Sequence, residues 1–94
     1  MKTSKYISGE TFEQAFKLIN DSLTFVGITK TEFASKMGIS RQNYYCWKRS
    51  KRIPWIDFLA VLLVLTAEAG RNGKDITKCA SLLKLIKIYE EESK

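Results

Sequence analysis

The sequence predicts an all-α domain of four to five helices joined by short turns. Only 5 glycines and 1 proline interrupt its 94 residues, and few stretches show the apolar–polar alternation of a strand. Apolar residues instead recur every three or four positions, which places side chains on one face of a helix. With 45% hydrophobic and 28% charged residues, the chain has the material for one core, and its length is typical of one compact domain.

Residues 1–7 are polar and basic and lack an apolar period, so we expect a flexible N-terminal arm. This segment also lacks the apolar stretch and cleavage site of a signal peptide, which predicts a protein that stays inside the cell. Ser8 is a candidate N-cap for a first helix that extends to about Thr24. The apolar positions of this helix are Phe12, Ala15, Phe16, Ile19 and Leu23.

A second helix follows a connector at residues 25–28. Thr29 and Glu32 have the spacing of a capping box, in which each side chain accepts the backbone N–H of the other residue, so they predict the helix start. Gly38 predicts its end, because a residue without Cβ readily takes the left-handed conformation that closes a helix.

A third helix is predicted only a three-residue turn beyond the second. Ser40 is its expected N-cap, and it would extend from Arg41 to about Arg49. Two short helices locked at a steep angle form a helix-turn-helix, which needs small, turn-forming and apolar residues at fixed positions. Tyr44 is larger than the aliphatic residue expected there, which indicates either a somewhat opened helix pair or a hydroxyl that reaches the surface. The core of the motif would comprise Phe33, Ala34, Met37, Gly38, Ile39, Tyr44 and Trp47.

Pro54 predicts the start of a fourth helix, since proline disfavours helix at the preceding residue and is tolerated in a first turn. This helix would extend to about Thr66 and is apolar nearly all round, which indicates burial on more than one side. Its apolar run is too short to cross a membrane. Residues 67–74 have the composition of an exposed loop, and a last helix follows. The apolar stripe of the last helix comprises Ile76, Cys79, Leu82, Leu83, Ile86 and Tyr89.

We therefore expect a flexible arm at residues 1–7, a helix-turn-helix domain at 8–66, and a loop with a C-terminal helix at 67–94. The two apolar helices provide more apolar surface than the helix-turn-helix unit needs to cover. Either this surface completes the core of a single chain or it joins copies of the chain. We expect the second, a dimer or a tetramer, and a monomeric mass in solution would contradict it.

The net charge of +6 is concentrated in one part of the chain. Residues 30–52 contain seven basic residues and one acidic residue, whereas the other nine basic and nine acidic residues cancel. A localised positive segment is the electrostatic footprint of a surface that binds phosphates. Because this segment coincides with the predicted helix-turn-helix, we expect double-stranded DNA as the partner.

With Tyr44 and Trp47 facing inward, the other side of the third helix would face the major groove. Arginine can make a bidentate contact to guanine and glutamine to adenine, while Tyr45 could contact a thymine methyl or a phosphate. The predicted base-contacting residues are Ser40, Arg41, Gln42, Tyr45 and Cys46. The predicted DNA-backbone contacts are Thr29, Lys30, Thr31, Asn43, Lys48, Arg49, Lys51 and Arg52.

The segment from Ile39 to Arg49, followed by Arg52-Ile53-Pro54, resembles the helix-turn-helix of temperate-phage regulators. It is similar to the lambda-type CII activators, which carry a Trp-Lys-Arg before an Ile-Pro and then a Leu-Ala-Val-Leu run. One extra residue between Arg49 and Ile53 is closer to the N-terminal domain of the phage CI repressor and to Cro. The resemblance covers about residues 29–65. The matching stretches here are Trp47-Lys48-Arg49, Ile53-Pro54 and Leu59-Ala60-Val61-Leu62.

This resemblance implies a lambda-repressor-like fold and a transcriptional regulator. A CII-type protein implies a homotetramer on two direct repeats beside a promoter, in contact with RNA polymerase. A Cro or repressor type implies a dimer on an inverted repeat. Both types imply a place in the cytoplasm of a bacterial host, at the nucleoid, and neither implies a cofactor or a membrane.

The sequence argues against an enzyme. It has no histidine for general-base or metal chemistry and no carboxylate pair among apolar residues, and its one glycine-rich stretch lacks the spacing of a P-loop. We predict no cofactor and no metal site. Cys46 and Cys79 are expected to be ordinary reduced thiols, with a redox switch at Cys46 as the lesser alternative.

The alternative from another class is a helix-turn-helix adaptor, an antitoxin or anti-repressor that binds a protein through its apolar C-terminal helices. For an adaptor, DNA binding would be absent, or would survive removal of the charges at Arg41, Lys48 and Arg49.

Overall fold

The computed structural model of the chain describes residues 5–38 and 41–92. Within this part it contains five α-helices, a short 3-10 helix and a two-stranded sheet, which confirms the predicted all-α class with four to five helices. None of these helices combines the length and the apolar content needed to span a membrane. The elements are β1 (Tyr6–Ser8), α1 (Gly9–Val26), α2 (Lys30–Met37), α3 (Arg41–Ser50), β2 (Arg52–Pro54), α4 (Trp55–Arg71), the 3-10 helix η1 (Ile76–Lys78) and α5 (Ala80–Glu92).

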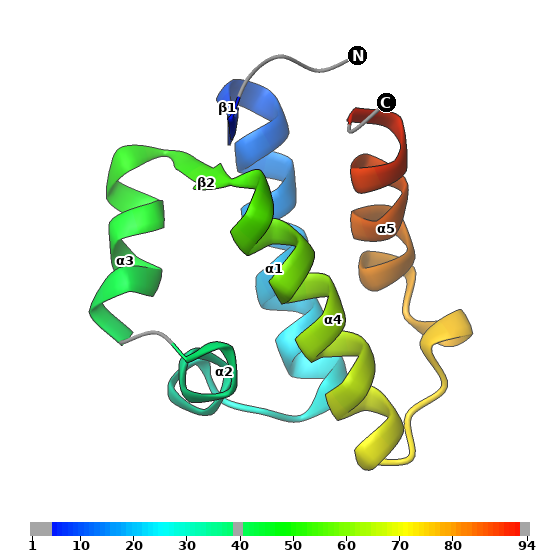
Figure 1. Cartoon of the computed structure of the whole chain (residues 1–94). Coiled ribbons are helices and arrows are strands. Elements are labelled where there is room, and N and C mark those ends of the chain that lie inside the picture. Colours follow the sequence, from blue (N-terminus) through cyan, green and yellow to red (C-terminus); the bar gives the residue numbers. More distant parts are fainter. Residues whose placement is uncertain (1–4, 39–40, 93–94) are drawn as a thin grey trace.

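Three long helices form the body of the molecule. Helices α1, α4 and α5 pack against one another, whereas α2 and α3 lie to one side of them (Figure 1). In Figure 1, α2 is seen end-on while α3 extends in the plane of the view, so the two helices cross steeply. This is the arrangement of a helix-turn-helix unit, with α3 bounded by the rest of the protein on its inner side only.

A two-stranded antiparallel sheet ties the start of the chain to the link between α3 and α4. Ile7 of β1 is paired with Ile53 of β2, and both side chains are buried. The prediction of a flexible arm at residues 1–7 is therefore wrong for Tyr6 and Ile7, while residues 1–4 lie outside the described part. The burial of Ile7 explains the strand, which is too short for its alternation to stand out in the sequence.

The first helix begins and ends close to where the sequence predicts. It extends to Val26, two residues beyond the predicted Thr24, and Gly27 closes it in the left-handed conformation with φ 88°. Ser8 does occupy the N-cap position, but its side chain makes no capping hydrogen bond.

The fourth helix is longer than predicted. Residues 67–71, which the sequence analysis assigned to a loop, are the last part of α4. Ala69 is fully buried, and the carboxylate of Glu68 lies 3.4 Å from Arg71 Nε and 3.9 Å from Lys36 Nζ of α2. Tertiary contacts thus extend the helix through Gly70, whose composition signal had indicated a turn.

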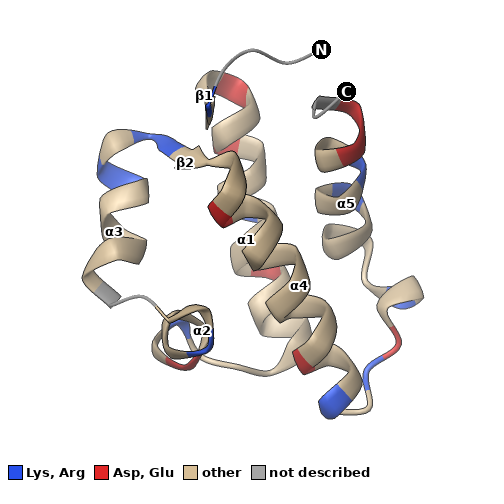
Figure 2. Ribbon diagram, viewed as in Figure 1, with Lys and Arg blue, Asp and Glu red and all other residues tan. Residues whose placement is uncertain are grey.

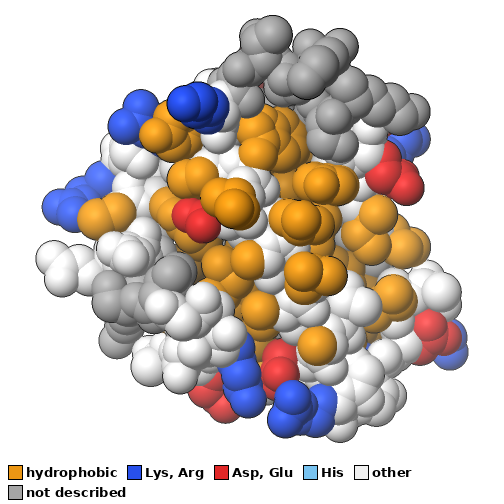
Figure 3. Space-filling model, viewed as in Figure 1, with side chains coloured by type: hydrophobic (Ala, Val, Ile, Leu, Met, Phe, Trp, Pro, Cys, Tyr) orange, Lys and Arg blue, Asp and Glu red, His pale blue; other side chains and the backbone are white. Residues whose placement is uncertain are grey.

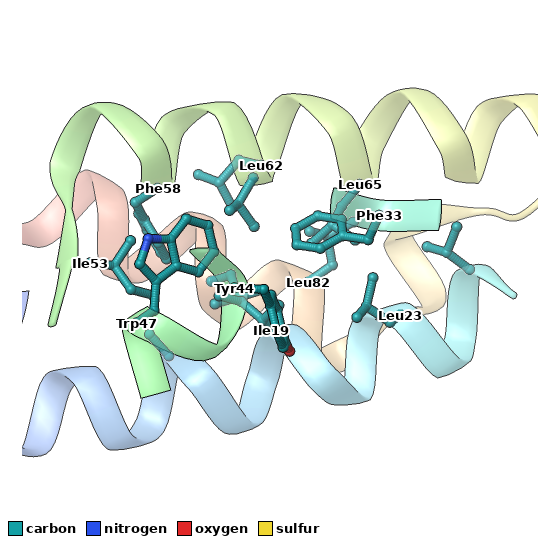
Figure 4. Close-up of a cluster of buried hydrophobic side chains, with 14 of the residues drawn as sticks. Ile19, Leu23, Phe33, Tyr44, Trp47, Ile53, Phe58, Leu62, Leu65 and Leu82 are labelled. Carbon is teal, nitrogen blue, oxygen red and sulfur yellow. The ribbon is translucent and has the colours of Figure 1, made fainter. Parts of the chain in front are cut away.

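One hydrophobic core joins the helix-turn-helix unit to the body (Figure 4). Phe33 of α2 and Trp47 of α3 lie next to the inner side of α4, whereas Tyr44 of α3 points toward α1, and aliphatic side chains of α1 and α5 fill the space around these rings. Burying each such side chain contributes roughly 1.5–3 kcal/mol. The labelled residues in Figure 4 are Ile19, Leu23, Phe33, Tyr44, Trp47, Ile53, Phe58, Leu62, Leu65 and Leu82.

The last helix uses its apolar stripe within the chain. Leu82 and Leu85 are fully buried against the body, and Tyr89 packs on the rings of α4. Leu83, predicted as part of the same stripe, is 43% exposed, and Ile76 lies in η1 rather than in α5. The buried side of α5 therefore serves the core of one chain, and the oligomerisation assigned to residues 67–94 stays a prediction.

The predicted capping box at the start of α2 is present. Thr29 Oγ1 accepts the Glu32 backbone N–H at 3.0 Å, and Glu32 Oε1 accepts the Thr29 N–H at 2.9 Å. Hydrogen bonds to the Glu32 carboxylate from the Thr29 backbone N–H and, second, from the Thr29 side chain hold the pKa of this carboxyl below its usual value. The box thus fixes the residue at which α2 begins.

Replacing Thr29 with alanine is expected to lower the free energy of unfolding by about 1 kcal/mol, because the Glu32 N–H loses its acceptor. Urea denaturation followed by circular dichroism measures the change. Thr24→Ala is the matched control, since Thr24 is exposed within α1, where alanine is a good helix former. Equal stability of the two variants would contradict the prediction.

Candidate nucleic-acid interface

The inner side of α3 is held by two aromatic residues, as the sequence predicts. Tyr44 is 1% exposed and Trp47 is 7% exposed. The Tyr44 ring lies 5.4 Å from the Phe16 ring of α1, 6.1 Å from the Phe33 ring of α2 and 5.9 Å from the Trp47 ring, measured between centroids. Tyr44 is therefore the contact at which three helices meet, and it sets how α3 stands on the body (Figure 4).

The hydroxyl of Tyr44 makes a hydrogen bond that the sequence analysis missed. It donates to Asn20 Oδ1 of α1 at 2.5 Å, while Asn20 Nδ2 donates to the Phe16 carbonyl at 3.1 Å. The prediction of a Tyr44 hydroxyl that reaches the surface is therefore wrong, because this hydroxyl is hydrogen-bonded to Asn20 inside the protein. Burial, with a further contribution from Tyr45, raises the pKa of Tyr44 to about 12. The one signal for Asn20 was a polar residue beside the apolar stripe of α1.

The predicted core of the helix-turn-helix is largely in place. Phe33 and Ala34 are buried, Met37 is half-buried against the core, and Gly38 closes α2 in the left-handed conformation with φ 75°. Ile39 and Ser40 lie outside the described residues, so the predicted plug of the turn and the predicted N-cap stay predictions.

The outer side of α3 is polar. Gln42, Asn43 and Cys46 are exposed, and so are the two basic residues that follow Trp47. Tyr45 is half-buried, with its ring edge-on to Tyr44 at 5.8 Å, so it reaches the outer side only in part. α3 begins at Arg41, whose side chain is outside the described part.

Basic side chains gather where α3 ends and β2 begins (Figure 2). Lys48, Arg49, Lys51 and Arg52 are all exposed here. Arg49 Nη2 donates to Cys46 Sγ at 3.3 Å, and the Arg52 guanidinium lies 4.5 Å from the centre of the Tyr6 ring. The strand β1 thus positions one of these charges. A shallow hollow at this end is lined by Cys46, Arg49, Ser50 and Arg52.

The start of α2 provides a weaker positive surface. Thr29, Lys30 and Thr31 are exposed, as contacts to the DNA backbone require. Glu32, however, stays ionised in the capping box and opposes an approaching phosphate. Lys36, counted in the basic segment, is partly neutralised by Glu68. The strongest positive surface is therefore at the C-terminal end of α3.

No metal chemistry is indicated by the described residues. They contain no group of three His, Cys, Asp or Glu side chains that could hold an ion. Cys46 is exposed and Cys79 is buried, and neither forms a disulfide.

Comparison with protein-family models, with curated proteins and with solved structures found no match for this chain. The class that the fold defines is a small all-α protein with a helix-turn-helix arrangement on one side of a three-helix body. Because a fold of this class can host many functions, the surface of α3 itself is the feature that bears on function.

Proposed function

We propose that the protein is a sequence-specific, double-stranded DNA-binding transcriptional regulator of the temperate-phage type, with α3 as its recognition helix. One observation carries the proposal: α3 is clamped from inside by Tyr44 and Trp47 while its outer side is exposed, polar and basic at one end. A major groove admits one helix, and a rigid, outward-facing helix with flanking charges is what such docking requires.

The contacts divide into two kinds. Gln42 and Cys46 are one turn apart on the exposed side of α3, and with Arg41 at the helix start they are suited to base edges. The basic residues at the end of α3 and the start of β2 meet phosphate oxygens, which fix the position of the protein without choosing a sequence. Thr29, Lys30 and Thr31 hold the phosphates on the other flank.

The regulator acts as a homo-oligomer on repeated half-sites, in the cytoplasm of a bacterial host and at its nucleoid. Direct repeats favour a CII-like activator that contacts RNA polymerase, and an inverted repeat favours a Cro-like or repressor-like dimer. These finer points rest on the resemblance at residues 29–65.

Selection of bound duplexes from a random DNA pool tests the proposal. We expect enrichment of half-sites about one helical turn, roughly 34 Å, apart. The variant Arg41→Ala with Gln42→Ala should lose the enriched sequence. Lys84→Ala with Lys87→Ala, a matched pair of exposed positions on α5, should retain it. Absence of enrichment in the unmodified protein would contradict sequence-specific binding and favour the adaptor.

Lys51 is expected to lower the stability of the folded protein and to raise its affinity for DNA. It closes α3 in the left-handed region with φ 57°, where a side chain is strained, and its N–H donates to the Trp47 carbonyl at 2.8 Å. Lys51→Gly should raise the free energy of unfolding by up to about 1 kcal/mol. The same change should weaken DNA binding by roughly fivefold, the effect of one lost phosphate contact near physiological salt.

Both effects of Lys51→Gly are measured on one sample, by urea denaturation and by fluorescence anisotropy with a labelled duplex. Lys51→Asn is the control, because asparagine tolerates the left-handed region while the charge is also removed. An increase in stability without any loss of affinity would exclude Lys51 from the interface.

A further inference from the structure

One side of α4 is apolar and exposed to solvent. Ile56 is 79% exposed, Leu63 is 63% exposed and Leu59 is 38% exposed, although the opposite side of the same helix is buried in the core. Their spacing places them on one stripe of the helix. Figure 3 shows that apolar side chains continue along this face. A contiguous apolar face of this kind is typical of an interaction surface.

The second half of the same stripe carries only small residues. Thr66, Ala67 and Gly70 are exposed, and a Cβ added to Gly70 would meet nothing within 4 Å. The Thr66 hydroxyl donates to the Leu62 carbonyl at 2.8 Å, so it presents no unpaired donor to a neighbour. The stripe therefore has large side chains at the N-terminal end of α4 and space at the C-terminal end.

We propose that a second copy of the chain docks on this stripe, with the two α4 helices antiparallel about a two-fold axis at Leu63. Leu63 is the middle residue of α4, so antiparallel packing centred there overlaps the whole helix. In this register Ile56 of each copy lies over Gly70 of the other, and Leu59 lies over Ala67. Large side chains thus fill the space left by small ones, which is the self-complementarity that a two-fold interface demands.

The flanking charges fit the same register. Asp57 lies near the start of α4 and Arg71 at its end, on the same flank of the stripe by helical spacing. The two-fold axis brings Asp57 of one copy beside Arg71 of the second copy, and the Arg71 side chain, which also pairs with Glu68 of its own chain, is 66% exposed. The stripe between them carries no charge, which disfavours a nucleic acid as the occupant. Charge and shape both favour a second copy.

This inference deepens the proposed function and, in its consequence for DNA, rests on it. α3 lies beside α4 in Figure 1, and Figure 3 shows from the same side that the apolar face over α4 is turned toward the viewer. The two-fold axis of the proposed dimer therefore crosses α4 in the plane of this view. Both α3 helices therefore come to the same side of the dimer. Since each half-site is then bound by a copy related by the axis, the expected DNA site is an inverted repeat rather than a direct one.

Self-association is measured without DNA, so its failure is distinguishable from failure of the proposed function. Sedimentation equilibrium of the full chain should give twice the mass of one chain at micromolar concentration. Gly70→Leu should raise the dimer dissociation constant by at least roughly thirtyfold, the effect of losing one hot-spot contact, because the added side chain fills the space that Ile56 of the second copy occupies. The variant should fold, because Gly70 is exposed, helical and surrounded by open space.

Two further variants make the test specific. Leu63→Arg places two like charges at the axis and should also yield monomers. Thr24→Leu, which introduces a leucine at an exposed position of α1, should leave the dimer unchanged. Asp57→Lys should weaken association severalfold, and Arg71→Glu in the same chain should restore it. Circular dichroism confirms that each variant is folded.

A monomeric mass of the unmodified chain at micromolar concentration would overturn the proposal. So would an oligomer whose mass is unaffected by Gly70→Leu and Leu63→Arg, because another surface would then join the copies. Absence of rescue by Arg71→Glu would overturn the antiparallel register.

Discussion

Removing the four positive charges at the end of α3 is expected to weaken DNA binding by roughly two to three orders of magnitude near physiological salt. Each basic residue that meets a phosphate releases a condensed counterion, so four lost contacts lower the slope of log K against log salt by about 3.6. The variant replaces these residues with glutamine, which keeps the side chains polar and long. The positions are Lys48, Arg49, Lys51 and Arg52.

A matched control removes the same charge from the opposite side of the molecule. Lys17, Lys78, Lys84 and Lys87 are exposed on α1, η1 and α5, away from the helix-turn-helix unit. Replacing these four with glutamine lowers the net charge equally but should leave the salt slope nearly unchanged. Fluorescence anisotropy of a labelled duplex at several salt concentrations measures both variants. If both variants lose the same affinity for the duplex, binding depends on the overall charge of the protein, and the end of α3 is not the DNA interface.

The helix-turn-helix unit was predictable because its signals are local. The Thr29–Glu32 capping box, the left-handed Gly38 and the inward spacing of Tyr44 and Trp47 each depend on residues within a few positions of one another. Such patterns are properties of a single helix or turn. They survive in the folded protein because the core accepts the same inward face.

The features that escaped prediction depend on residues far apart in the chain. Asn20 and Tyr44 are 24 positions apart, and their hydrogen bond exists only because α3 packs on α1. The pairing of Ile7 with Ile53 likewise follows from the way α4 begins beside the first strand. Neither contact leaves a periodic signal. The only sequence signal for the Asn20–Tyr44 hydrogen bond was a polar residue on an apolar face of α1.

The two sides of α4 show the same limit. A helix that is apolar nearly all round predicts burial on more than one side, but within one chain the fold covers one side and leaves Ile56 and Leu63 exposed. Which side is covered depends on where α1, α2 and α5 come to lie. Which side of α4 is exposed as a candidate interface therefore follows only from the positions of the other helices.

Truncating Tyr44 is expected to cause the largest loss of stability of any change proposed for this chain. Tyr44→Ala removes a fully buried ring that contacts rings of α1, α2 and α3, and such truncations lower the free energy of unfolding by about 3–5 kcal/mol. A domain of this size has a total of about 5–15 kcal/mol, so α3 loses its support and much of the protein unfolds in mild denaturant. Urea denaturation monitored by circular dichroism gives the change.

Tyr44→Phe separates the hydroxyl from the ring. It keeps the ring contacts but leaves Asn20 Oδ1 without its donor, so the expected loss is about 1–2 kcal/mol. Tyr89→Phe is the matched control, because it removes a hydroxyl from a half-buried ring that packs on Phe58 and Trp55. A loss in Tyr44→Phe no larger than in Tyr89→Phe would exclude the hydrogen bond as a source of stability.

The pH dependence of stability provides a second readout for the same hydroxyl. Its pKa is raised to about 12 in the folded protein from 10.0, so the folded state holds this proton more tightly than the unfolded chain does. The contribution of this hydroxyl to the free energy of unfolding is fully present below pH 10. It is lost as the pH rises through 12, because the unfolded chain loses the Tyr44 proton at a lower pH than the folded protein does. Tyr44→Phe lacks this contribution, whereas every other titratable group is shared by the two proteins. The stability difference between the two should therefore shrink from pH 9 to pH 11.5, and a constant difference would show that Tyr44 titrates alike in both states.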